Sequence, residues 1–254
     1  MEMLKLKAGR RRLVVLLVVF GVVAGCTVAS GCRPKAPPLV LTPPWQAGEF
    51  SRLDVSNGTT GERLGGWDME VRRDPAGGGY VLSMWTNLPG ASEHSDVTVS
   101  AADLVPSLLE YQGEVGEAKT MYLIRAEYAG GKVTITATKD GVGQPVPTVK
   151  LPKGRYFDNE QFGFVLRSLP LAEGFQATLN VIVTKTVTKT QISVVVGAAE
   201  SVTVPAGTFN CWPVELVGLG QKAWVAVDDP HQLVQYSSGN GAIISKLTEF
   251  RPGQ

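Results

Sequence analysis

Alternation of apolar and polar residues dominates the chain after about residue 45. In residues 132–139 apolar side chains alternate with threonines, as in a strand with one buried and one solvated face. Gly130-Gly131 precedes this segment and follows a similar run at 121–128, and a Gly-Gly pair accepts the positive φ angles of a two-residue turn. The pattern therefore predicts a β-hairpin here, and a second one over residues 68–85 around three glycines.

The C-terminal half repeats the strand pattern. Short links of Gly, Pro, Asp and Asn separate its segments, so neighbouring strands are expected to be antiparallel. The predicted strands cover residues 178–187, 191–196, 202–204, 211–217, 222–227, 233–237 and 243–250.

One segment, at about 158–171, has helical periodicity instead. Asp158 and Gln161 have the spacing of a capping box, and Pro170 ends the pattern. Between them the apolar side chains fall at i, i+3, i+4 and i+7: Phe162, Val165, Leu166 and Leu169. A second, short helical turn is expected at about 100–109, interrupted by Pro106. The predicted fold is mainly β: a curved antiparallel sheet or half-barrel with one packed helix.

The first 25 residues have the three parts of a bacterial lipoprotein signal peptide. Five basic residues precede an apolar run at 13–23, which is shorter than the roughly 20 residues of a membrane span. Val23-Ala24-Gly25-Cys26 then matches a lipobox, so Cys26 is predicted to carry the lipid. The alternatives are an ordinary cleaved signal or an uncleaved anchor. A second possible lipobox, Ala29–Cys32, lacks the large aliphatic residue that Val23 supplies, so Cys26 is favoured over Cys32.

The rest divides into a tether and one domain. Residues 26–44 are rich in proline, which favours an extended spacer, and residues 45–254 form the predicted single β-rich domain. The net charge of +1 becomes mildly acidic once the basic leader is removed, so nothing favours nucleic acid as a partner. Cys32 and Cys211 are left in an oxidising compartment, where pairing stays open although a buried thiol at Cys211 is favoured.

Candidate catalytic residues are few. His94 lies in a polar segment and His231 in a predicted turn after Asp228 and Asp229, and both histidines are interpreted as solvated loop residues. The sequence contains no nucleophile motif and no phosphate-binding loop, so no catalytic residue and no cofactor are expected. Asp228, Asp229 and His231 are close in sequence, but adjacent residues of an extended chain point in opposite directions, so no metal site is expected either. The lysines of residues 184–190 are interpreted as a solvated face. Core packing is favoured over a ligand groove for Trp45, Trp67, Trp85, Trp212 and Trp224.

Several motifs in the C-terminal half resemble a known family. They are Leu-Arg-Ser-Leu-Pro-Leu at 166–171, Glu-Ser-Val-Thr-Val-Pro-Ala-Gly-Thr-Phe-Asn-Cys at 200–211, Lys-Ala-Trp-Val at 222–225, Asp229-Pro230 and Leu-Val-Gln-Tyr at 233–236. The chain resembles domain-of-unknown-function family 3108, a group of bacterial envelope β proteins, over residues 156–250 and by general strand pattern at 45–150. The resemblance implies a form similar to the open half-barrels of the Lol lipoprotein-sorting system, and it brings no catalytic residues.

These observations lead to a functional expectation. The chain is expected to be a non-enzymatic lipoprotein of the cell envelope, anchored outside the cytoplasm, in the periplasm or at the cell surface. Its sheet would bind an apolar ligand or an envelope protein. One alternative is an envelope hydrolase or cell-wall enzyme that uses His231 or His94, and another is a purely structural lipoprotein. The identity of the ligand, the choice between inner and outer membrane, and the oligomeric state stay open.

Overall fold

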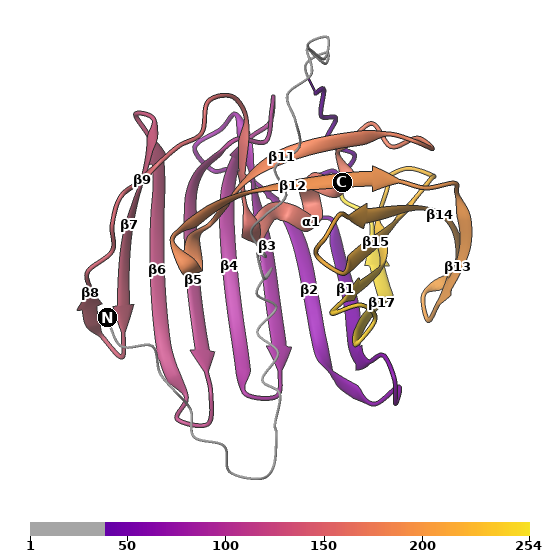
Figure 1. The fold of residues 1–254 in the computed structure, drawn as a ribbon, viewed down its shortest axis with the longest axis horizontal. Helices are drawn as coiled ribbons and strands as arrows, with labels where there is room; N and C mark the ends of the chain where they lie inside the picture. Colours follow the sequence, from indigo (N-terminus) through magenta and orange to yellow (C-terminus); the bar gives the residue numbers. More distant parts are fainter. Residues whose placement is uncertain (1–38) are drawn as a thin grey trace.

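The structure is a computed structural model that describes residues 39–254, and almost all of its regular elements are strands (Figure 1). The predicted signal peptide, Cys26 and most of the predicted tether lie outside the described residues. The strands of the N-terminal half are β1 (Phe50–Asn57), β2 (Arg63–Arg73), β3 (Gly79–Leu88), β4 (Ala91–Ser100), β5 (Pro106–Val115), β6 (Thr120–Ala129), β7 (Lys132–Lys139), β8 (Val142–Gln144) and β9 (Val149–Lys150). Those that follow are β10 (Tyr156–Asp158), β11 (Gln176–Val183), β12 (Thr188–Val196), β13 (Glu200–Val204), β14 (Gly207–Leu216), β15 (Gln221–Ala226), β16 (Leu233–Ser238) and β17 (Ile243–Arg251).

The strands form one curved sheet. Consecutive strands from β1 to β7 and from β14 to β17 pair antiparallel, and β17 pairs with β1, which joins the two halves. The sheet continues from β14 through β12 to β11, and β10 pairs parallel with β11 at that end. Figure 1 shows the result: β11 and β12 cross in front of β3–β6, with the helix α1 (Phe162–Arg167) beside them. The predicted curved sheet with one helix is confirmed.

Both predicted hairpins are confirmed. β2 pairs with β3, and β6 pairs with β7 in the register Ala126↔Ile135. Gly130 and Gly131 have φ angles of 58° and 74°, the left-handed values that only glycine adopts without strain. Alternation along β7 buries Val133 and Ile135 while the threonine between them faces solvent.

The helix begins at the predicted capping box. Asp158 accepts a hydrogen bond from the Glu160 backbone N–H at 2.8 Å, and the Gln161 side chain accepts one from the Asp158 N–H at 3.2 Å. A 3-10 turn, η1 (Asn159–Gln161), precedes α1. The whole predicted apolar stripe is buried. The helix ends at Arg167, before the predicted residue 171, and its C-cap is Ser168, whose carbonyl accepts the Thr42 N–H at 3.0 Å.

The predicted helical turn at 100–109 is wrong. The chain makes a single tight turn after Ser100 and then enters β5 at Pro106. Leu104, which is fully buried, adopts a φ of 58° in this turn. A continuing right-handed helix requires a negative φ at this position. The side chain of Asp103 accepts the Val105 N–H at 3.2 Å, a local bond that competes with helix formation.

Packing against the helix begins before residue 45. Leu41 and Trp45 are buried in the core. The Trp45 ring packs edge-on against the Phe164 ring, with 5.8 Å between the ring centroids. A buried ion pair joins Arg167 of α1 to Glu49 at 2.7 Å. Arg167 also donates to the carbonyls of residues 230 and 231 at 2.9 and 2.8 Å, so this one guanidinium holds helix, N-terminal segment and the β15–β16 turn together. Residues 39–254 contain no helix with the length and apolarity to cross a membrane.

Candidate functional site

The candidate site is a cavity of about 60 Å³ between α1 and the concave face of the sheet. Phe162, Gly163 and Leu166 form its roof, because the helix turns this side toward the sheet. The opposite wall comes from inward-facing positions of β1–β3 and of β16–β17. These positions are Val55, Trp67, Met84, Thr86, Leu88, Tyr236, Ser238, Ile243 and Ser245. The apolar surface is therefore contributed by both halves of the chain.

One end of this cavity is charged. Lys185, which follows β11, places its Nζ 2.9 Å from Glu93 Oε2 on β4 and 3.3 Å from Glu160 Oε1 on η1. The Tyr111 ring lies 4.6 Å from the same ammonium. Burial alone would lower the pKa of Lys185, but the carboxylates of Glu160 and Glu93 raise it above its ordinary value. This end of the cavity therefore holds one ammonium between two carboxylates.

A second polar cluster, centred on Asp158, is adjacent to the first. The Asp158 carboxylate is fully buried and accepts hydrogen bonds from the hydroxyls of Tyr128 on β6 and Thr184 after β11. Burial first, and then the nearby charge of Glu160, raise the pKa of Asp158 to about 6, against the opposing effect of these hydrogen bonds. The cluster ties β6 to β10 and β11, so it holds the crossing strands over the sheet.

Two buried polar atoms, one on each of two residues that line the cavity, have no hydrogen-bond partner within residues 39–254. They are Trp67 Nε1, a donor, and Asn159 Oδ1, an acceptor; both atoms are buried. Leaving such an atom unpaired costs about 1–3 kcal/mol. The amide nitrogen of Asn159 donates to Glu160 Oε1 at 3.3 Å, whereas its carbonyl oxygen has no donor among the described residues.

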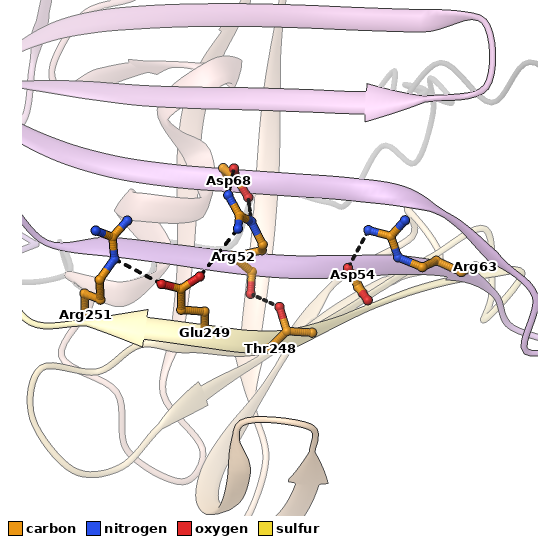
Figure 2. Close-up of polar contacts among 7 residues, drawn as sticks. All are labelled: Arg52, Asp54, Arg63, Asp68, Thr248, Glu249 and Arg251. Carbon is orange, nitrogen blue, oxygen red and sulfur yellow. Dashed lines mark hydrogen bonds and ion pairs between the residues drawn. The ribbon is translucent and has the colours of Figure 1, made fainter.

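The convex face of the sheet has different chemistry. Figure 2 shows cross-strand pairs of arginine and carboxylate on β1, β2 and β17. Arg52 donates to both oxygens of Asp68 at 2.8 Å, and Glu249 lies 3.5 Å from the same guanidinium. Arg63 pairs with Asp54 at 2.9 Å in the same way. These side chains are substantially exposed, and their arrangement satisfies charge on a solvated surface.

The two histidines lie away from the cavity lining. His94 is in β4 rather than in the predicted loop, and its ring stacks on Trp85 at 4.7 Å with Nε2 3.2 Å from Asp96. His231 is in the predicted turn, where Nδ1 lies 2.9 Å from the Ala226 carbonyl oxygen and Nε2 3.5 Å from Asp229. Within residues 39–254, no group of three or more His, Cys, Asp or Glu side chains could hold a metal ion.

Other predicted residues are placed as follows. Lys185 is only 17% exposed, so its interpretation as part of a solvated face is wrong, whereas Lys189 is exposed. Cys211 is buried in β14, and burial raises the pKa of its thiol to about 12. Trp45 is in the core, while Trp67 lines the cavity. Sequence reasoning missed Glu93 and Glu160, since neither forms a motif with Lys185.

Comparison with known proteins agrees with this architecture. A family model described as "Protein of unknown function (DUF3108)" matches residues 52–243. The chain belongs to this family. None of the curated proteins matches it. The matched region includes α1, η1 and both carboxylates of the charged end, so all of the cavity lining except Ser245 lies within the family domain.

Two solved structures are similar to this family member. A β-barrel-like protein of domain-of-unknown-function family 1849 from Brucella abortus has a TM-score of 0.53 at 12% identity, covering 83% of this chain and 99% of its own. A putative exported protein with a YmcC-like fold from Bacteroides fragilis has a TM-score of 0.32 at 11% identity, covering 84% and 99%. The first likeness establishes a shared fold and carries no functional residue.

Proposed function

We propose that this chain is a non-enzymatic envelope lipoprotein, anchored through Cys26, that binds an apolar ligand in the cavity under α1. The supporting observation is a partly enclosed, mainly apolar cavity, two of whose lining residues each carry a buried polar atom without a partner among the described residues. A bound molecule that pairs with either atom recovers the cost of its burial. Its apolar part would gain from leaving water.

The size of the cavity limits the ligand. One water needs roughly 10–15 Å³ measured in the same way, and an apolar cavity of about 150 Å³ holds benzene. The volume of about 60 Å³ therefore accepts a short apolar segment as it stands. A six-carbon chain, which is comparable in size to benzene, requires the roof to move outward. That roof is a helix of six residues that follows the capping box, packs its apolar side chains into the core and is tied to Glu49 through Arg167.

The envelope location rests on the sequence. The Cys26 lipobox predicts a lipid anchor, and residues 27–38 would then link it to the packed part of the chain. A fully extended segment of this length spans at most roughly 40 Å. The cavity would therefore lie close to a membrane surface, where apolar and amphiphilic ligands are concentrated.

Binding of 1-hexanol to the full chain in amphipol tests the proposal. Isothermal titration calorimetry should show saturable binding with a Kd of about 1 mM or tighter, against a blank of amphipol alone. Gly163→Leu should abolish the binding, because a Cβ at 163 lies 3.4 Å from Met69 Cε and 3.7 Å from Trp67 Cζ2, so a larger side chain grows into the cavity.

A matched control is available. Gly143 on β8 is exposed, and a Cβ there meets no atom within 4 Å, so Gly143→Leu should bind hexanol like the unaltered chain. Thr86→Phe narrows the cavity from the sheet side and covers the case in which Gly163→Leu fails to fold. Absence of saturable binding in the unaltered chain, or equal binding in all three variants, would overturn the proposal.

A further inference from the structure

The charged end of the cavity carries more negative than positive charge. Glu93 and Glu160 lie on opposite sides of one ammonium, at 2.9 and 3.3 Å from Lys185 Nζ. These three residues are at most 17% exposed, and all line the cavity. Two carboxylates against one ammonium leave an excess of one negative charge at a place with little water to screen it.

Neighbouring groups respond to this excess. The pKa of Lys185 is raised although burial opposes it, because Glu160 and Glu93 favour the ammonium. The pKa of Tyr111 is raised by burial first, and Glu93 and Glu160 add to the shift while Lys185 opposes it. Glu160 contributes in the same direction at Asp158. Titratable groups on three different elements therefore experience a negative environment.

Hydrogen-bond acceptors are also in excess at this end. Lys185 is already engaged by two carboxylates and by the face of Tyr111. Asn159 is 6% exposed, lines the same cavity, and its Oδ1 has no donor within the described part of the chain. The site consequently lacks a donor and a positive charge. A protonated primary amine supplies both, with three N–H groups.

We propose that the cavity binds a single-chain amphiphile whose headgroup is a protonated primary amine. The ammonium lies among Glu93, Glu160 and the Asn159 carbonyl, and the alkyl chain runs between Phe162, Leu166 and Trp67. This inference rests on the proposed function, since it names the ligand class for the same cavity. An anionic headgroup would meet two carboxylates and an ammonium that already has partners.

Three probes with one chain length test the headgroup: hexylamine, 1-hexanol and hexanoate. Each is titrated into the full chain in amphipol at pH 7.5, where the amine is protonated, and calorimetry gives the affinity after subtraction of an amphipol blank. Hexylamine should bind at least about tenfold more tightly than hexanoate, since one favourable charge contact at a buried site is worth that or more. Hexanol should fall between them.

Variants locate the preference. Glu160→Gln and Glu93→Gln each remove the excess charge and should reduce hexylamine affinity about tenfold with little change for hexanol. Glu127→Gln is the matched control, because Glu127 is an exposed carboxylate on the convex face, paired with Arg125 at 3.2 Å. It should leave all three affinities unchanged.

The outcomes separate the two proposals. Hexanol or hexanoate binding as tightly as hexylamine would overturn the amine headgroup and leave the apolar site standing. Failure of all three probes to bind would overturn the proposed function itself. A hexylamine preference that survives both Glu→Gln changes would place the amine elsewhere and also contradict the inference. The comparison among probes needs no variant, so it stands even if a substitution prevents folding.

Discussion

Asp158 provides a quantitative test of how the crossing strands are held. Its carboxylate is fully buried, caps η1, and accepts hydrogen bonds from Tyr128 and Thr184. Asp158→Asn keeps the shape of the side chain and removes its titration. The amide can still pair with the two hydroxyls, since a hydroxyl can accept as well as donate.

The magnitude follows from the pKa. Burial raises it from 3.8 to about 6, which corresponds to roughly 3 kcal/mol at 1.36 kcal/mol per unit. A pKa raised in the folded state gives stability that is fully present below pH 3.8 and lost as pH rises through about 6. The contribution of Asp158 to the free energy of unfolding should therefore fall by about 2–3 kcal/mol between pH 4 and pH 7.5.

The assay is urea unfolding of the full chain followed by tryptophan fluorescence at several pH values. The quantity of interest is the free energy of unfolding of Asp158→Asn minus that of the unaltered chain, which should increase with pH by about 2–3 kcal/mol. Asp229→Asn is the control, because Asp229 is 91% exposed, and its difference should stay flat. A flat difference for Asp158→Asn, or one that decreases with pH, would refute the reasoning.

Three further predictions concern the helix, the convex face and the anchor. Leu166→Ala should lower the free energy of unfolding by about 2–5 kcal/mol, because the side chain is fully buried; in chemical unfolding, a loss below about 0.5 kcal/mol would mean that the helix contributes little packing. Arg52→Ala should cost no more than about 1 kcal/mol, because its pair with Asp68 is partly exposed, and a loss above about 2 kcal/mol would contradict the description of this surface as solvated. Cys26→Ser should abolish fatty-acid labelling and leave unprocessed precursor, whereas Cys32→Ser should change neither. Loss of labelling in Cys32→Ser would assign the lipid to Cys32 instead of Cys26.

Local chemistry made much of the fold predictable from the sequence. Gly130-Gly131 determines a hairpin because only glycine takes both φ angles readily, and Asp158 with Gln161 marks a helix start through bonds made within four residues. The error at Pro106 has a local cause too, because a tight turn and a helical turn share short-range hydrogen bonds. Patterns of this length do not reveal how far a helix continues once tertiary contacts hold its end.

The candidate site could not be predicted from the sequence, because it depends on contacts between residues far apart in the chain. Lys185 and Glu93 are 92 positions apart, and their pairing depends on how β11 crosses the sheet. Alternation showed that a strand near Lys185 has two faces, but it did not show that the crossing turns this lysine toward the interior. His94 was misplaced in a loop because its segment is polar, whereas β4 is a strand whose outward positions carry polar groups.

The most direct test of the cavity as a ligand site is a crystal structure of the full chain with 6-bromohexylamine. The anomalous signal of bromine locates one end of the molecule without assumptions about the rest. The account predicts a bromine peak in the apolar part of the cavity, near Trp67 and Leu166, with the amine beside Glu93 and Glu160. A bromine peak beside those carboxylates, or one confined to the convex face, would contradict it.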